Sequence, residues 1–165
     1  MKKLINKTIA LLVLLILVSC NSDDDGETIE TLKTFDQLTK NDIEALETTM
    51  SDADLNAANE TGVLWENGKI LLYKTNEGRF GKMKVLNIDI EDNYKLTIEV
   101  VTFATDGLVY NSNSFFEVPG TWVPDLDEIV LDGADHDQDF HWSRFSTTTR
   151  IAPRNGFVFV EYNLN

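Results

Sequence analysis

Turn dipeptides interrupt an alternating pattern of apolar and polar residues over most of this chain, from residue 63 to residue 163. These dipeptides are Asn67-Gly68, Asp92-Asn93, Asp106-Gly107, Pro119-Gly120 and Asn155-Gly156. A period of two is the repeat of a β-strand, and Asn-Gly favours the positive φ angles of a two-residue hairpin. No strand pattern alternates with a helical one, so a parallel sheet is not expected. The sequence predicts an all-β fold, an antiparallel sandwich or partly open barrel of about eight or more strands.

The expected strands are short and closely spaced. In chain order they cover residues 63–66, 69–75, 82–91, 94–104, 108–118, 122–123, 128–131, 140–145, 150–152 and 157–163. The clearest alternation places Leu86, Ile88 and Ile90 on one face of its strand and polar residues on the other. Pro124-Asp125 is expected to separate two of the shortest strands.

A helical segment is expected ahead of the strands, over residues 35–61. Ile43, Leu46 and Met50 form one apolar stripe at helical spacing. Two patterns can cap its start, Thr39-x-x-Asp42 and Asn41-x-x-Glu44, and Ser51-x-x-Asp54 repeats the signal later. One long helix and two short helices broken near Ser51 both fit this pattern. In either form the segment is expected to cover one open end or one face of the sheet.

The first twenty residues have the organisation of a secretory signal. Lysines at positions 2, 3 and 7 precede an apolar run from Ile9 to Val18, which is ten residues long. A transmembrane helix needs roughly 20 such residues, so this run is too short to span a bilayer. Leu17-Val18-Ser19-Cys20 resembles a bacterial lipobox. The resemblance implies that residues 1–19 are removed and that Cys20, the only cysteine, receives acyl chains such as palmitate and anchors the protein in the membrane.

An acidic tether is expected over residues 20–34. Ser22, Asp23, Asp24 and Asp25 resemble the export signal of surface-exposed lipoproteins of the Bacteroidota. This resemblance implies an outer-membrane protein that faces the cell exterior. Beyond the tether, residues 35–165 are expected to form a single globular domain, with the helical segment at 35–61 and the β domain at 62–165.

The β domain carries a looser resemblance of its own. Its motifs are Thr75-x-x-Gly78 followed by Phe80-Gly81-Lys82-Met83-Lys84-Val85, Gly120-Thr121-Trp122-x-x-Asp125-Leu126-Asp127, Asp139-x-x-Trp142 and Pro153-x-Asn155-Gly156. Together they are similar to uncharacterised β-rich lipoproteins of the Bacteroidota. The resemblance implies a fold and a location, and it brings no activity and no site residues.

The charge of the chain limits its partners. The formal net charge is −14, and removal of residues 1–19 takes away three lysines and no acid. A chain this acidic repels nucleic acid. The partners expected are the lipid membrane, through acylated Cys20, and a glycan or an envelope protein.

An acidic loop at residues 132–139 is the densest polar cluster. Asp135, Asp137 and Asp139 alternate, and carboxylates at this spacing can converge on a hard cation such as Ca²⁺. The EF-hand pattern then fails, because its sixth position is Phe140 instead of glycine and its twelfth is Ser146 instead of glutamate. We therefore expect a solvated loop, with these three residues as the candidate ligands if an ion binds, and we expect no cofactor.

Catalytic motifs are missing from the sequence. There is no G-x-S-x-G, no P-loop and no G-x-G-x-x-G, and among 28 acidic residues carboxylate pairs arise by chance. Trp65 and Trp142 are in phase with apolar neighbours and are expected in the core, whereas Trp122 lies beside Gly120 and Pro124 and is expected to be exposed. An exposed aromatic ring can stack on a sugar, which makes Trp122 the candidate ligand-binding residue.

Two functions from different classes remain. The first is a membrane-anchored lipoprotein with a β-rich binding or structural domain. The alternative is a small hydrolase that acts on envelope or extracellular polysaccharide. A cleft with converging carboxylates of perturbed pKa would favour the hydrolase, and a filled sandwich would favour the binding domain.

Overall fold

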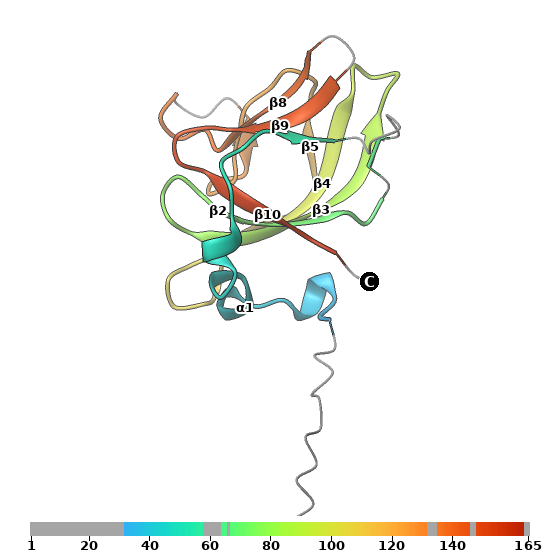
Figure 1. The fold of residues 1–165 in the computed structure, drawn as a ribbon. Coiled ribbons are helices and arrows are strands. Elements are labelled where there is room, and N and C mark those ends of the chain that lie inside the picture. The colour runs from blue at the N-terminus through green and yellow to red at the C-terminus, as the bar shows by residue number, and fades with distance from the viewer. Residues whose placement is uncertain (1–31, 58–63, 66, 132–134, 146–147, 164–165) are drawn as a thin grey trace, which may run out of the picture. The chain divides into compact units, whose positions relative to one another are not determined.

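The structure, a computed structural model, describes residues 32–57, 64–65, 67–131, 135–145 and 148–163 (Figure 1). The predicted signal peptide, the lipidation site Cys20 and the export signal at Ser22–Asp25 lie outside these residues. In the part of the chain that is described, no helix is both long and apolar enough to cross a membrane.

A five-stranded antiparallel sheet forms the larger layer. Its strands are β2 (Ile70–Lys74), β3 (Phe80–Asp89), β4 (Lys95–Phe103), β5 (Val109–Val118) and β10 (Val158–Tyr162). The order across the sheet is β10-β2-β3-β4-β5, so four strands in sequence form a meander and the last strand returns beside β2. Gly68, Gly78, Gly107 and Gly156 adopt positive φ in the turns, which is why the turn dipeptides located the strand ends well.

A three-stranded sheet, in the order β1-β9-β8, forms the second layer. Its strands are β1 (Leu55–Asn56), β8 (Phe140–Phe145) and β9 (Thr148–Pro153), and β6 (Pro124–Asp125) pairs separately with β7 (Val130–Leu131). One buried cluster joins the two layers, and it includes Tyr73, Met83, Ile98, Phe116, Phe140, Trp142, Ile151 and Phe157. The described strands therefore form an antiparallel sandwich, and the predicted all-β class is confirmed.

The N-terminal helical segment covers the other face of the five-stranded sheet (Figure 1). It contains η1 (Phe35–Gln37), α1 (Lys40–Glu44) and η2 (Glu47–Thr49). The carboxylate of Asp42 accepts the backbone N–H of Thr39 at 2.8 Å, so the first of the two predicted caps is the one used for α1. Phe35, Leu38 and Ile43 pack on Ile70, Leu72, Phe80 and Phe103 of the sheet. The expected cover over one face is confirmed.

The chain after Ser51 is extended, where a second helix was one of the expectations. Ser51 pairs with Phe159 of β10 through two backbone hydrogen bonds of 2.9 and 3.0 Å. Leu55 in β1 pairs with Ile151 of β9, and the N–H of Ala57 donates to the carbonyl of Thr149. Strand pairing with distant segments thus overrides the local capping signal.

Two details of the strands also differ from expectation. The register of β3 against β4 shifts between Val85 and Asn87, so Val85 and Ile88 both pack against the core, whereas Ile90 lies beyond the end of β3 and is exposed. A bulge of this kind reverses the alternation beyond it. Pro124-Asp125, expected to separate two strands, itself forms the short strand β6.

Lys82 in β3 is the buried cation of this fold's helical face. Its side chain is 5% exposed, and its ammonium donates to the carbonyls of Phe35 at 2.6 Å and Leu38 at 2.9 Å. The rings of Phe35 and Phe103 lie 4.8 and 5.6 Å from the same nitrogen. Burial lowers the pKa of Lys82. The ammonium of Lys82 therefore holds the helical segment against the five-stranded sheet.

Gly81, the neighbour of Lys82, makes room for the ring of Tyr73 on the opposite face of the sheet. A Cβ at residue 81 would lie 2.3 Å from Cζ of that ring. The hydroxyl of Tyr73 lies 2.8 Å from Oγ1 of Thr102, which donates to the carbonyl of Leu126 at 2.6 Å. This chain of contacts runs from the middle of the sheet to the turn that follows β6.

Candidate functional site

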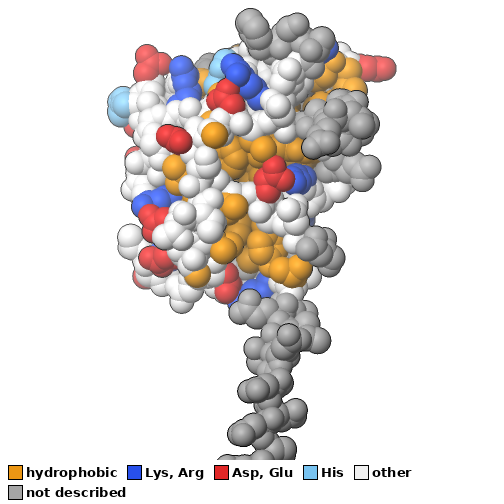
Figure 2. Space-filling model, in the orientation of Figure 1, with side chains coloured by type: hydrophobic (Ala, Val, Ile, Leu, Met, Phe, Trp, Pro, Cys, Tyr) orange, Lys and Arg blue, Asp and Glu red, His pale blue; other side chains and the backbone are white. Residues whose placement is uncertain are grey.

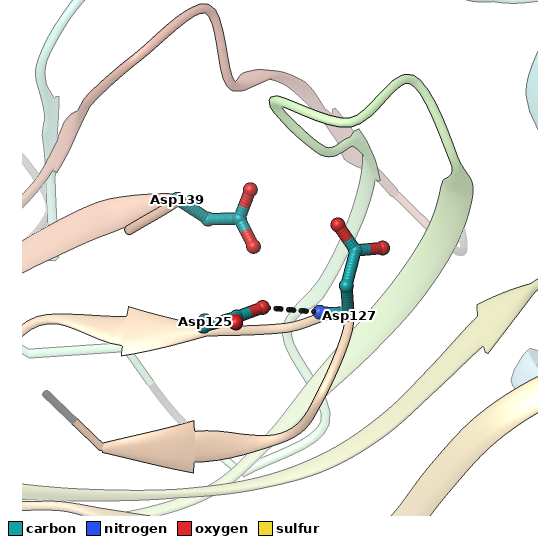
Figure 3. A group of neighbouring side chains, drawn as sticks. All are labelled: Asp125, Asp127 and Asp139. Carbon is teal, nitrogen blue, oxygen red and sulfur yellow. Dashed lines mark hydrogen bonds between the residues drawn. The ribbon is translucent and has the colours of Figure 1, made fainter. Parts of the chain in front are cut away.

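Three buried carboxylates converge beside that turn (Figure 3). Asp125 belongs to β6, Asp127 follows it in the turn to β7, and Asp139 immediately precedes β8. One carboxylate oxygen of each residue lies within 4.8 Å of the others. The side chains are 6%, 1% and 0% exposed, in chain order. Three acids are thus buried together by the turn after β6 and the residue that precedes β8.

Asp139 is held by backbone amides on both carboxylate oxygens. Its Oδ1 accepts the N–H of Asn76 at 3.0 Å and its Oδ2 accepts the N–H of Leu126 at 2.7 Å. Burial raises the pKa of Asp139 to about 7, the two amides oppose this rise, and the charges of Asp127 and Asp125 add to it. Asp139 therefore joins the loop after β2 to the turn after β6.

Asp125 organises the turn that carries Asp127. Its Oδ1 accepts the N–H of Asp127 at 2.8 Å and that of Glu128 at 3.2 Å. This is a side-chain-to-backbone turn of the kind that aspartate favours. Burial raises the pKa of Asp125, and the two amide hydrogen bonds oppose the rise.

Asp127 differs from the other two carboxylates. Both of its oxygens are buried, and neither has a hydrogen-bond donor in good geometry. Nη1 of Arg79 lies 3.2 Å from Oδ1 and forms the ion pair of this residue. Burial raises the pKa of Asp127, while Thr75 and Arg79 oppose the rise. Arg79 is itself shared, because it also pairs with Glu77 and stacks 4.2 Å from the ring centre of Tyr110.

A third buried oxygen without a donor belongs to Asn76, whose backbone binds Asp139. The backbone N–H of Asn76 bonds Asp139, and its side-chain Nδ2 donates to the carbonyl of His136 at 2.6 Å. The remaining side-chain oxygen, Oδ1, is buried and has no hydrogen-bond partner. A buried acceptor left in this state carries a desolvation penalty of about 1–3 kcal/mol.

Only one of the three predicted metal ligands belongs to this group, namely Asp139. Asp135 is exposed, and its Oδ1 lies 3.4 Å from the side-chain nitrogen of Gln138. Asp137 lies beside His136, with 3.1 Å between the carboxylate and Nε2. Asp125 and Asp127 take their places. Sequence reasoning missed these two, although the pattern Asp125-Leu126-Asp127, an apolar residue between two acids, was a signal that could have found them.

The tryptophans lie where their sequence context indicated. Trp142 is fully buried, Trp65 packs partly buried against the core, and Trp122 is 37% exposed. The carbonyl of Trp122 accepts the N–H of Trp142 at 2.9 Å, which ties the exposed residue to β8. The exposure expected for Trp122 is confirmed, and its role in ligand binding stays a prediction.

No family model, curated protein or solved structure matches the chain. The chemistry of the site is therefore judged from its geometry. Buried carboxylates this close together favour protonation of one of them, because like charges in a poorly polar environment do not all ionise. They can also bind a hard cation, because carboxylate and amide oxygens are the ligands that Ca²⁺ prefers.

Proposed function

We propose that the protein is a membrane-anchored lipoprotein whose β-rich domain binds a partner or supports an assembly at the outer membrane. One observation carries the non-catalytic part of this proposal. The converging carboxylates are 6%, 1% and 0% exposed. A general acid or base must come within hydrogen-bond reach of the substrate, or act through one water. Carboxylates covered in this way do not offer that reach to a polymer chain.

The surface of the domain supports a binding role. Leu108, Val109 and Tyr110 are consecutive and exposed, and Trp122 adds an exposed aromatic ring elsewhere. Figure 2 shows apolar side chains gathered over the middle of the visible face, with acidic and basic side chains around them. Contiguous exposed apolar side chains are typical of surfaces that meet a partner, here a glycan or an envelope protein.

The anchoring part of the proposal rests on the sequence. The basic start, the short apolar run and Cys20 in its lipobox context support lipidation, and Ser22 with Asp23–Asp25 supports display at the cell exterior. Several acyl chains hold a protein firmly, since each buried CH₂ contributes about 0.8 kcal/mol.

The alternative, a small hydrolase of envelope or extracellular polysaccharide, has one observation in its favour. Three carboxylates converge, and the pKa of Asp139 is raised to about 7, as in a general acid. A polysaccharide whose hydrolysis by the full chain disappears on Asp139→Asn, with the fold intact, would establish this alternative and overturn the binding role.

Membrane fractionation tests the anchor. The unaltered chain is expected in the detergent phase, and Cys20→Ala is expected in the aqueous phase because it has no thiol to acylate. Ser19→Ala is the matched control, since it keeps a small residue ahead of the cysteine and should leave the protein in the detergent phase. Replacing Asp23, Asp24 and Asp25 with asparagine should preserve anchoring and reduce cleavage by external protease on whole cells. A membrane-bound Cys20→Ala protein, or unchanged protease cleavage, contradicts the corresponding part of the proposal.

A further inference from the structure

The charges around the three carboxylates do not balance. Asp125, Asp127 and Asp139 together carry three negative charges when ionised, and Arg79 is the cation that pairs with the group among the described residues. Arg79 also pairs with Glu77, so its single positive charge is divided. Burying charge is costly unless it is paired, and an uncompensated buried charge is strongly destabilising.

The hydrogen bonds divide the group into two parts, which we call the frame (Asp125 and Asp139) and the open side (Asp127). The carboxylates of Asp125 and Asp139 accept hydrogen bonds from four backbone amides, which fix them in position. Asp127, which is 1% exposed, has no well-formed hydrogen bond on either oxygen, and Figure 3 shows its carboxylate turned toward that of Asp139. The lack of a well-formed hydrogen bond on this buried side chain, whose ion pair is to the shared Arg79, is an observation separate from the clustering of acids.

We infer that Asp125, Asp127 and Asp139 form a binding site for a hard divalent cation, with Ca²⁺ as the best-fitting ion. One cation would offset the two negative charges that remain after Arg79 is counted. It would also give the carboxylate of Asp127 a second positive partner beside Arg79. Oδ1 of Asn76, buried and without a donor, is the nearby neutral oxygen of the same chemical kind.

The donor set selects among cations. All of the oxygens named are carboxylate or amide oxygens, which Ca²⁺ and Mg²⁺ prefer. Zn²⁺ favours sulfur and imidazole ligands, and the nearby His136 has an exposed side chain that faces Asp137. Ca²⁺ accepts irregular geometry with carboxylates of several kinds, whereas Mg²⁺ demands a near-ideal octahedron. The carboxylate and amide oxygens of this site come from an irregular turn and loops, and such an arrangement suits Ca²⁺ better than Mg²⁺.

The ion would join three segments of the chain, of which the first is distant in the sequence from the other two. These are the loop after β2, which contributes Asn76, the turn after β6, which contributes Asp127, and the approach to β8, which contributes Asp139. An ion that binds only the folded chain raises its stability by mass action. The inference goes beyond the proposed function and does not depend on membrane anchoring.

Titration calorimetry with calcium chloride tests the inference on the detergent-solubilised full chain, after treatment with chelator, at pH 7.5. One site per chain is expected, together with a rise in melting temperature of about 5 °C or more at saturating Ca²⁺. Asp127→Asn keeps the size of the side chain and removes a charge, and it should weaken calcium binding at least tenfold. Because no backbone amide bonds the Asp127 carboxylate, the variant is expected to fold, and circular dichroism in chelator checks this.

Asp135→Asn and Asp137→Asn are the matched controls. Each makes the same change of charge in the neighbouring acidic loop, outside the carboxylate group, and each should bind Ca²⁺ as the unaltered chain does. Two results overturn the inference. One is the absence of one-site binding to the unaltered chain, in which case the carboxylates are balanced by protons. The other is binding that survives unchanged in Asp127→Asn, which would place the ion elsewhere.

Discussion

Lys82 and the three carboxylates are two buried charged regions of one sandwich, and they are treated in opposite ways. The ammonium of Lys82 is one charge with two carbonyl acceptors and two aromatic rings around it. The carboxylates are three charges with one shared guanidinium, and Asp127 has no well-formed hydrogen bond. The chain supplies all the partners of Lys82, whereas it supplies the three carboxylates with less positive charge than they carry negative charge.

This difference teaches how to separate a structural charge from a candidate functional one. Burial alone does not distinguish them, because Lys82 and Asp127 are both almost fully covered. What differs is whether the chain itself supplies the partners that a buried charge requires. A buried charge with a complete set of partners indicates a structural role. A buried charge with an incomplete set indicates a candidate site for a ligand.

The largest effect expected in this comparison comes from Lys82→Met. Methionine keeps the apolar packing of the side chain but leaves the carbonyls of Phe35 and Leu38 without a donor. At about 2 kcal/mol for each buried acceptor, the free energy of unfolding should fall by about 4 kcal/mol, measured by urea denaturation. Lys84→Met is the matched control, because Lys84 is on the same strand and forms a partly exposed pair with Glu99. The loss of unfolding free energy in Lys84→Met should be below about 1 kcal/mol. Equal losses in the two variants would show that Lys82 does not hold the helical segment more firmly than a surface ion pair does.

The second effect is a pH dependence of the carboxylate region, measured in chelator. The pKa of Asp139 is about 7 in the folded chain against an ordinary value of 3.8, so the folded state holds a proton that the unfolded state releases between these values. Stability should therefore fall as pH rises from about 4 to about 7, by on the order of 3 kcal/mol. The raised pKa values of Asp125 and Asp127 act in the same direction, while the lowered pKa of His141 acts in the opposite one. Asp139→Asn isolates the contribution, and a slope unchanged in this variant would contradict the assignment.

The third and smallest effect separates two members of the carboxylate group at constant pH. Asp139→Asn places an amide where two backbone N–H groups donate, so one of them loses its acceptor, and unfolding free energy should fall by about 2 kcal/mol. Asp127→Asn removes no backbone hydrogen bond, and the repulsion that it relieves offsets the loss of the ion pair with Arg79, so in chelator it should be neutral or stabilising by up to about 1 kcal/mol. The same cost in both variants would mean that the frame and the open side are not distinct.

The parts of the fold that sequence predicted are those with local causes. The meander from β3 to β5 follows from alternation and from turn dipeptides such as Asp106-Gly107, which act over a few residues. A helix continuing past Ser51, whether as one long helix or as a second short one, is not found in the described residues up to 57, because the partner of Leu55 is Ile151, almost a hundred residues later. The shift beside Val85 also has no local signal in the apolar pattern.

The site was predictable only in part, and for the same reason. Asp139 stood out within an acidic run, but its neighbours Asp125 and Asp127 reach it only through the folding of a different loop. Sequence spacing therefore grouped Asp139 with Asp135 and Asp137, which the structure leaves apart. The role of Lys82 was missed too, because its acceptors are backbone carbonyls. Every residue has such a carbonyl, so the sequence carries no signal for them.

The attachment of the helical segment has a mechanical consequence. If the protein is anchored through Cys20 as proposed, any drag on the domain reaches the described chain at Leu32. The first contacts placed under tension are then the bond from the N–H of Lys33 to the hydroxyl of Tyr162 and the two bonds of Lys82. Under force these hydrogen bonds should break first. The helical segment would then detach from the sheet and extend, while the strands of the sandwich keep their register.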